Sequence, residues 1–377
     1  MSTLRLAVEI GGAGHHPGAW RHAGAHPDRL VDAGYHVELA RTAERGTLDF
    51  VAIPDSFAPP PAALPAPARG RLDAVAIAAR VAPATRGVGL VPTATTTHTE
   101  PFHLSKAIAT LDYVSHGRAG WEADVSRTEA EARLFGRKHA APPEDLYAEA
   151  ADAIEVVTRL WDSWEDDAVI RDVATGRYVD RDRLHPIDFA GRFFSVKGPS
   201  ITPRPPQGRP PVVLRVDDDE AWVPAARHAD VVRTSAPDLE TARSFRARIR
   251  AAVEAAGRDP AAVAVLVDVV TQLGHSADAA QAGWDELDRL GGRPWRPESA
   301  RFAGTPSGLA DLVEEWFHEG AADGFVVRPV LLPDGLTALA DGVVPALRDR
   351  GLFRRAYPGR TLRDTFGLAR PASRYAA

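Results

Sequence analysis

Short apolar runs recur along the chain, most of them ending at a polar residue, a proline or a glycine. They predict buried strands at residues 4–10, 49–55, 88–92, 118–125, 211–216, 230–234, 263–270 and 325–327. Apolar residues at helical spacing predict helices at 39–46, 73–80, 100–114 and 239–256, and a longer apolar stripe over 146–161 predicts another. The chain therefore alternates strand and helix over most of its length.

This alternation favours an α/β fold in which parallel strands close into a (β/α)8 TIM barrel, because about eight strands are available. The alternative is an open doubly wound sheet that binds a dinucleotide, which needs a glycine-rich first turn. Gly11, Gly12 and Gly14 follow the first strand but lack the full G-x-G-x-x-G spacing. Since barrels with insertions reach this length, we expect one domain covering residues 1–377.

Two segments interrupt the alternation. Residues 58–69 are rich in proline, and residues 164–211 mix charged runs with glycine and proline. Neither composition suits the regular wall of a barrel. We expect both to project as insertions, in places where barrels carry functional loops.

Composition narrows the class of protein. The chain is 45% hydrophobic and 25% charged, and its net charge of −6 without a basic cluster predicts neither nucleic acid nor an anionic membrane as a partner. It has no cysteine, which excludes disulfides, thiolate metal sites and a cysteine nucleophile. The histidines lack carboxylates at a convincing ligand spacing, so no metal site is expected. Without a targeting segment or a run of about 18 apolar residues, we expect a soluble cytoplasmic protein.

The segment from Thr93 to Gly120, TATTTHTEPFHLSKAIATLDYVSHGRAG, resembles the luciferase-like flavin-dependent monooxygenase family. The resemblance is to the branch that holds the large components of nitrilotriacetate, EDTA and dibenzothiophene-sulfone monooxygenases. Further segments agree with this branch, at 160–164, 191–211, 304–325, 351–354 and 361–364. Because it covers nearly the whole chain, the resemblance implies a TIM barrel of the bacterial luciferase-like type.

The same resemblance implies an FMNH2-dependent monooxygenase, the large component of a two-component system that oxygenates a small organic substrate with O2. Reduced FMN would come from a separate NAD(P)H:flavin reductase, and the flavin would carry the oxygen chemistry. A homo-oligomer is expected. Two alternatives stay open. One is a degenerate luciferase-like barrel with weak or no FMN binding, which acts as a binding or partner subunit or uses another ligand. The other is a deazaflavin-dependent oxidoreductase on the same barrel.

Asp55 and Tyr147 match positions that border the flavin in the family, and a third candidate, Thr95, is chosen for its place at a strand end. Asp55 ends the second predicted strand, where a barrel gathers functional groups, although a carboxylate there can also cap a helix or turn. Thr95 stands in a run of threonines at the third strand end, and its hydroxyl can bond the flavin ring or simply pack. Tyr147 can donate to a ring or phosphate oxygen, or be an ordinary half-buried tyrosine. We expect all three to converge on one cleft, and we assign no catalytic residue.

The chain departs from the family near these contacts. Four residues before Tyr147, where relatives usually carry a histidine, it has Pro143. Relatives generally read Trp-Asn where this chain reads Trp121-Glu122, so an acceptor-only carboxylate replaces an amide. Donation from this position to a flavin carbonyl would be lost unless Glu122 is protonated.

The largest departure is in the expected phosphate turn. In relatives, the strand matching 212–216 opens into a turn whose glycines and serine meet the FMN phosphate. Aligned on 225–230, the glycines fall on Val216 and Ala221, and the serine falls on Asp218. An acidic turn can be an ordinary helix cap, but a carboxylate about 5 Å from a phosphate costs roughly 3 kcal/mol at an effective dielectric of about 20. We therefore expect Asp218 to weaken the binding of FMN.

Overall fold

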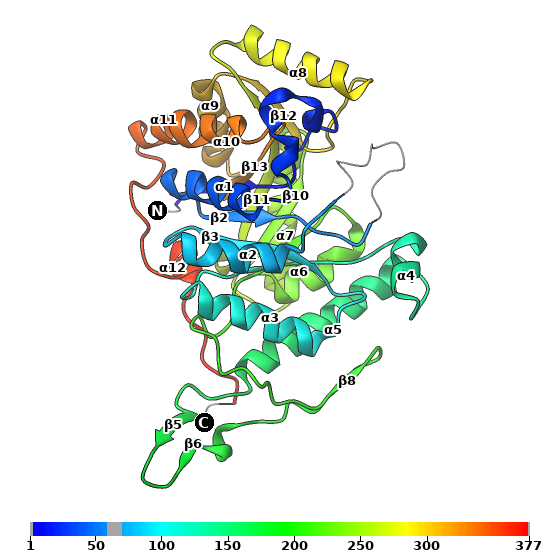
Figure 1. Cartoon of the computed structure of the whole chain (residues 1–377), viewed down its shortest axis with the longest axis vertical. Helices are drawn as coiled ribbons and strands as arrows, with labels where there is room; N and C mark the ends of the chain where they lie inside the picture. Colours follow the sequence, from blue (N-terminus) through cyan, green and yellow to red (C-terminus); the bar gives the residue numbers. More distant parts are fainter. Residues whose placement is uncertain (1–2, 59–69, 376–377) are drawn as a thin grey trace.

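The computed structural model describes residues 3–58 and 70–375, in which one large parallel sheet is accompanied by two small hairpins (Figure 1). The strands of the large sheet are β1 (Arg5–Glu9), β2 (Phe50–Ile53), β3 (Gly89–Thr95), β4 (Trp121–Asp124), β9 (Val212–Arg215), β10 (Val231–Ser235), β11 (Ala264–Leu273), β12 (Ala300–Gly304) and β13 (Gly324–Pro329). The hairpins pair β5 (Val169–Asp172) with β6 (Arg177–Val179) and β7 (Phe189–Ala190) with β8 (Ser195–Val196).

The large sheet closes on itself. Its strand order is β10-β9-β4-β3-β2-β1-β13-β11-β12, and β10 also pairs with β11. Its pairings are parallel. Because β10 pairs with both β9 and β11, eight strands form a closed barrel, and β12 extends the sheet beyond β11. The predicted (β/α)8 barrel is confirmed, and each predicted strand overlaps one of the eight.

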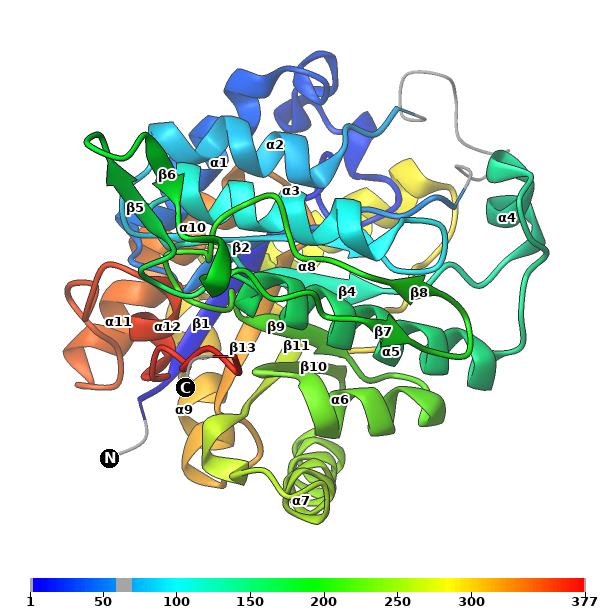
Figure 2. The same ribbon diagram turned by 90° about the horizontal axis from the view of Figure 1, so that it is seen from below.

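Helices surround the strands (Figure 2). They are α1 (Ala33–Arg45), α2 (Ala74–Val81), α3 (Pro101–Val114), α4 (Glu129–Phe135), α5 (Pro143–Asp162), α6 (Trp222–His228), α7 (Leu239–Ala255), α8 (Ala277–Gly291), α9 (Pro306–His318), α10 (Asp334–Ala338), α11 (Val344–Asp349) and α12 (Leu362–Phe366). The apolar stripe that predicted α5 is buried along its whole length, from Leu146 to Trp161. No helix in the described part of the chain is long and apolar enough to cross a membrane.

Polar side chains define where several helices begin. The Asp73 side chain accepts a hydrogen bond from the N–H of Ala76 at the start of α2, and Asp238 does the same for Thr241 in α7. Pro143 is the first residue of α5, a position where a missing N–H costs nothing. Pro143, at the position where the resemblance implies a histidine, therefore starts the helix.

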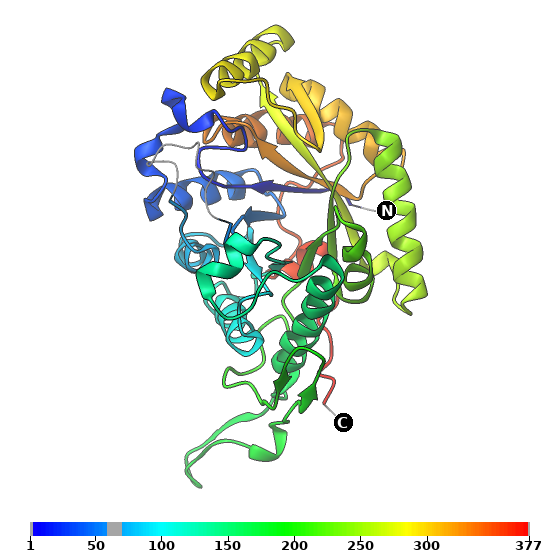
Figure 3. The same cartoon turned by 90° about the vertical axis from the view of Figure 1, so that its right-hand side faces the viewer.

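The insertion at 164–211 differs from the expectation in one respect. It joins the end of α5 to the start of β9, so it leaves from the amino end of the barrel and not from the mouth where functional loops lie. The β5–β6 hairpin and α8 lie at opposite extremities of the molecule (Figures 1 and 3). The tip between β7 and β8 returns along α5, where Arg192 pairs with Asp145 at 2.7 Å near the helix start. Of the other predicted insertion, residues 59–69 lie outside the described part of the chain.

Candidate functional site

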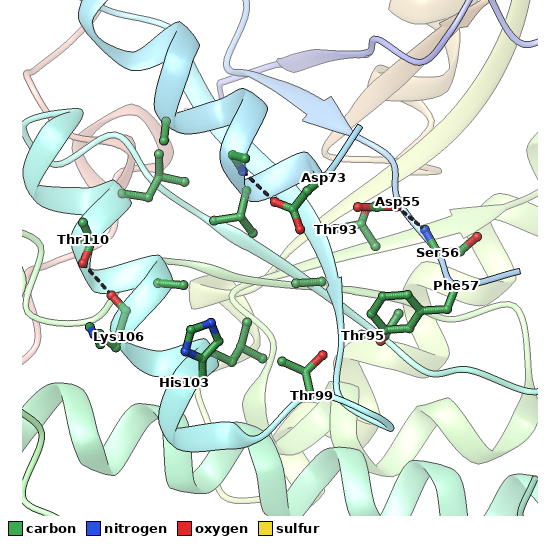
Figure 4. A pocket seen from close by; sticks show the side chains of 17 residues that line it. Asp55, Ser56, Phe57, Asp73, Thr93, Thr95, Thr99, His103, Lys106 and Thr110 are labelled. Atoms are coloured by element: carbon green, nitrogen blue, oxygen red, sulfur yellow. Dashed lines mark hydrogen bonds between the residues drawn. The ribbon is translucent and has the colours of Figure 1, made fainter. Parts of the chain in front are cut away.

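A cavity of about 400 Å³ lies beside the carboxyl ends of β2 and β3. Asp55, Thr93 and Thr95 line it from the strand side, and residues of α2 and α3 form the facing wall (Figure 4). That wall is largely aliphatic, with Val75, Ala76, Ala79, Leu104, Ala107 and Leu111. Apolar walls with a few convergent polar groups are typical of small-molecule sites.

Asp55 lies just beyond β2, and two main-chain amides hold its carboxylate. One oxygen accepts from the N–H of Ser56 at 2.8 Å, and the other from the N–H of Ala74, the first residue of α2, at 3.0 Å. Burial raises the pKa of Asp55 above its ordinary value despite these bonds and the nearby Arg71. Asp55 therefore makes the capping contacts of the alternative interpretation while it also lines the cavity.

Thr95, the last residue of β3, has a buried hydroxyl that is not hydrogen-bonded. Thr95 is only 3% exposed, and its Oγ1 has no hydrogen-bond partner among residues 3–58 and 70–375. The adjacent Thr96 differs, because its hydroxyl donates to the carbonyl oxygen of Asp124 at 3.1 Å. A buried polar atom left unpaired costs about 1–3 kcal/mol.

A second polar group joins α5 to the turn after β9. The phenol of Tyr147 donates to Asp218 Oδ2 at 2.7 Å, and Arg127 Nη2 donates to Tyr147 Oη at 2.7 Å and to Asp218 Oδ2 at 3.1 Å. The bond from Tyr147 and the charge of Arg127 lower the pKa of Asp218. Burial and the bond to Asp218 raise the pKa of Tyr147. The carboxylate is thus a paired charge, held by two hydrogen-bond donors.

The helix-cap interpretation does not describe the Asp218 side chain. Asp218 precedes a short 3-10 helix at Asp219–Ala221, but in the described structure its side chain accepts no cap hydrogen bond from that helix. The neighbours Asp217, Asp219 and Glu220 are exposed. Asp218 is therefore the one acid of this turn that faces Tyr147.

Arg127 connects the two groups, and the sequence analysis missed it. Its Nη1 donates to Asp124 Oδ1 at 3.3 Å, and Asp124 pairs in register with Thr95 across β3 and β4. The predicted residues thus form two pairs: Asp55 and Thr95 line the cavity, while Tyr147 and Asp218 lie outside its lining and are bonded to Arg127. Arg127 follows β4 by three residues. This strand-end position, the criterion that selected Asp55, was the available signal.

Inside the barrel, Glu122 belongs to a buried ionic network. Its Oε2 accepts from Arg233 Nη1 at 2.5 Å, and Arg233, 1% exposed at its side chain, also bonds Glu9 at 2.9 Å and Asp268 at 3.1 Å. Two further arginines complete the network, Arg215 on Asp268 at 2.5 Å and Arg328 on Glu9 at 3.0 Å. Three guanidinium groups therefore balance three carboxylates. Glu122 is held as the acceptor of an ion pair, so this position provides no donor to a ligand.

Histidines near the mouth have structural contacts. His16 bonds Asp288 at 3.0 Å, His98 stacks on Phe135 with ring centroids 4.6 Å apart, and His103 lines the cavity. Over residues 3–58 and 70–375, no group of three or more His, Cys, Asp or Glu side chains is placed to hold a metal ion.

Comparisons with known proteins place the chain in one family. A family model described as luciferase-like monooxygenase matches residues 13–316. N-acetyl-S-(2-succino)cysteine monooxygenase of Bacillus subtilis (strain 168) is 34% identical over 99% of this chain and 98% of its own length. Nitrilotriacetate monooxygenase component A of Aminobacter aminovorans is 34% identical over 95% of each chain. The branch recognised from residues 93–120 is confirmed.

A solved structure shows the same architecture. EDTA monooxygenase from Chelativorans sp. BNC1 superimposes with a TM-score of 0.85 at 28% identity, covering 98% of this chain and 99% of its own. An F420-dependent secondary alcohol dehydrogenase has a TM-score of 0.65 at 16% identity, over 92% of this chain and 100% of its own, which shows a shared fold alone. The comparison therefore favours the FMN branch over the deazaflavin alternative.

Proposed function

Because the chain belongs to the luciferase-like monooxygenase family, we propose that it is the large component of a two-component, FMNH2-dependent monooxygenase that oxygenates a small organic substrate with O2. The observation that carries this proposal is the similarity to monooxygenases over almost the full length of both chains. The barrel alone would not carry it, since the same fold hosts many activities.

The residues present fit a flavin ring. The cavity beside β2 and β3 contains an unpaired buried hydroxyl at Thr95 and a carboxylate with a raised pKa at Asp55. In a ring system with carbonyl and N–H groups along one edge, a carbonyl can accept from the Thr95 hydroxyl and an N–H can donate to the Asp55 carboxylate. These two residues would hold the polar edge, and the aliphatic wall from α2 and α3 would exclude water from the ring.

When bound, reduced FMN supplies the electrons that activate O2. The chain contributes binding and orientation. Thr95 would donate to the ring edge and Asp55 would accept from it, while the Glu122–Arg233 pair balances charge inside the barrel. We assign no proton transfer to any of them.

The phosphate end of the site is where this chain differs from its relatives. Tyr147 and Arg127 donate to Asp218 in the predicted phosphate turn, so Asp218 already occupies both donors. Arg127 offsets most of the repulsion that an isolated Asp218 would exert, so the cost to a phosphate is mainly competition for these two donors. We propose that Asp218 weakens FMN binding by this competition, without abolishing it.

The degenerate-barrel alternative is not favoured, because relatives along the whole chain are named as monooxygenases. The proposal requires a flavin reductase as the FMNH2 donor and a small organic substrate. Self-association into a homo-oligomer and a cytoplasmic location stay predictions.

The proposal is tested by mixing the protein anaerobically with photoreduced FMN and then with O2. Bound flavin is expected to reoxidise at a rate different from that of free FMNH2, and Thr95→Val should move the rate towards the free value. In the presence of a reductase, NADH and a panel of small organic substrates, 18O from 18O2 should enter a product. Reoxidation unchanged by the protein at millimolar flavin would contradict the proposal.

A further inference from the structure

A second cavity, of about 380 Å³, lies at the other end of the barrel. Its lining residues stand where strands begin: Arg5 opens β1, Asp230 precedes β10 and Asp323 precedes β13. Helix α7 adds Arg246 and Arg250. Because the barrel strands are parallel, this amino end faces away from the mouth that contains the candidate flavin site.

The cavity is rich in guanidinium groups. Three arginines and two aspartates line it, which gives a formal charge of 3 − 2 = +1. Asp323 is shared, since it accepts from Arg246 at 2.7 Å, from Arg250 at 3.0 Å and from the N–H of Val265 at 2.8 Å. The Asp323 carboxylate is therefore the ion-pair partner of two of the three arginines.

The second carboxylate, that of Asp230, pairs with an arginine that does not line the cavity. Asp230 accepts from the N–H of Val212 at 3.0 Å and lies 3.4 Å from Nη2 of Arg363. Arg5, the third lining arginine, donates to the carbonyl oxygen of Thr365 and lies 3.8 Å from Asp49. Asp49 in turn is closer to Arg354, at 3.0 Å. Positive charge around the cavity thus exceeds the carboxylates that balance it.

Two further observations agree with a shortage of hydrogen-bond acceptors and negative charge around this cavity. The Nε atom of Arg250 is buried and has no hydrogen-bond partner within the described part of the chain. Burial lowers the pKa of Arg5 below its usual range, and the charge of Arg354 adds to this although Asp49 opposes it.

We propose that this cavity binds a small oxyanion carrying two or more negative charges, of the phosphate or dicarboxylate class. Guanidinium groups present several donors in a planar fork that suits such anions. The volume exceeds that of inorganic phosphate, so bridging water or a larger organic anion fits as well. The bound anion joins α7 to the starts of β1, β10 and β13, and stabilises the amino end of the barrel. The site is independent of the proposed flavin chemistry.

The test uses the full chain and inorganic phosphate as the probe, with malonate as a second arm for carboxylates. Thermal unfolding and calorimetric titration are run against chloride at equal ionic strength. Phosphate at about 100 times its Kd is expected to raise Tm by on the order of 2–5 °C, while chloride does not. Arg5→Gln should weaken phosphate binding about tenfold.

Two matched substitutions, each adding one negative charge, show where the anion binds. Ala262 lines the cavity and is exposed, so Ala262→Asp places a negative charge at the cavity without disturbing the Asp323 contacts. Ala277, exposed at the start of α8, gives a control variant of the same net charge in Ala277→Asp. Arg127→Gln tests whether the anion binds at the mouth instead.

The proposal predicts that the phosphate response disappears in Ala262→Asp and persists in Ala277→Asp and Arg127→Gln. It is overturned if phosphate and chloride act alike on the unmodified protein, or if Arg127→Gln alone removes the response. Should Ala262→Asp unfold, as judged by its circular dichroism, the affinity of Arg5→Gln decides the question. Undiminished affinity in that variant contradicts the site.

Discussion

Asp218 shows how a single residue changes the electrostatics expected of the site. The sequence places this carboxylate where relatives have a serine, and predicts repulsion of a phosphate. In the structure the same carboxylate is hydrogen-bonded to Tyr147 and paired with Arg127, so it occupies both donors. Substitution of Asp218 would free these donors.

Asp218→Ser with Ala221→Gly should therefore raise FMN affinity by about tenfold or more, because Tyr147 and Arg127 become available to the phosphate. Fluorescence titration measures the change. Riboflavin, which lacks the phosphate, is the control ligand, and its affinity should stay within about twofold. An equal gain for both ligands would show that the turn acts on the ring and not on the phosphate.

Two adjacent threonines give a matched test of the ring contact. Thr95→Val removes a hydroxyl that has no partner, so we expect unchanged or slightly higher stability together with about fivefold weaker binding of reduced FMN. Thr96→Val removes a hydroxyl bonded to Asp124, so we expect a loss of about 1 kcal/mol in the free energy of unfolding and little effect on binding. Urea unfolding and flavin titration separate the two. Destabilisation by Thr95→Val would mean that its hydroxyl is already satisfied.

At the scale of strands and helices, the eight barrel strands could be predicted because each is a short apolar run buried within the barrel. The strand β12 was missed, since Ala300–Gly304 carries Arg301 and two small residues at its end and lies at the edge of the sheet. The β5–β6 hairpin was missed because its residues are half-buried or exposed, with Val173 in its turn 94% exposed. Periodicity detects only segments that bury one face.

The site was predicted in part for a similar reason. Strand ends follow from the pattern, which selected Thr95 and, together with the family resemblance, Asp55, whereas contacts between loops depend on the closed fold. The pairing of Arg127 with Asp218, 91 residues apart, could not be derived from spacing. Arg233 within a predicted strand was a signal left unused, because a charge in a central strand requires partners on neighbouring strands.

The strands also carry a prediction about stability. Arg233→Gln would leave Glu9, Glu122 and Asp268 with less compensation, so we expect a loss of about 3–5 kcal/mol in the free energy of unfolding near neutral pH. Urea unfolding measures it. Arg243→Gln, an exposed arginine on α7, is the control and should cost less than about 1 kcal/mol.

The pH dependence of the same network has a definite sign. Burial opposes ionisation of Glu9 and Asp268, but the surrounding arginines outweigh it and lower the pKa of both. Carboxylates with lowered pKa stabilise the fold above their unfolded pKa of about 4, and that stability is lost as the pH falls further. Unfolding free energy should therefore drop steeply below about pH 4, and less steeply in Arg233→Gln. Equal slopes in both proteins would remove the network as the cause.

At the scale of the whole molecule, the barrel separates two ends with different chemistry. The mouth holds an apolar cavity with an unpaired hydroxyl, and beyond it an acid that occupies the donors of the expected phosphate position. The amino end holds a cavity with excess guanidinium groups. The resemblance and the fold together predict the flavin end, while the amino-end cavity arises only from the folded arrangement of residues distant in sequence.

The central claim, a reduced-flavin site whose phosphate donors are already occupied, is tested most directly by anaerobic calorimetric titration of the unmodified protein with photoreduced FMN and reduced riboflavin. We predict that both bind, and that the phosphate improves affinity less than about tenfold, since it must displace Asp218 from Arg127 and Tyr147. A preference for reduced FMN of about a hundredfold or more would contradict the occupancy of the phosphate donors, and absence of binding by both flavins would contradict the proposed function.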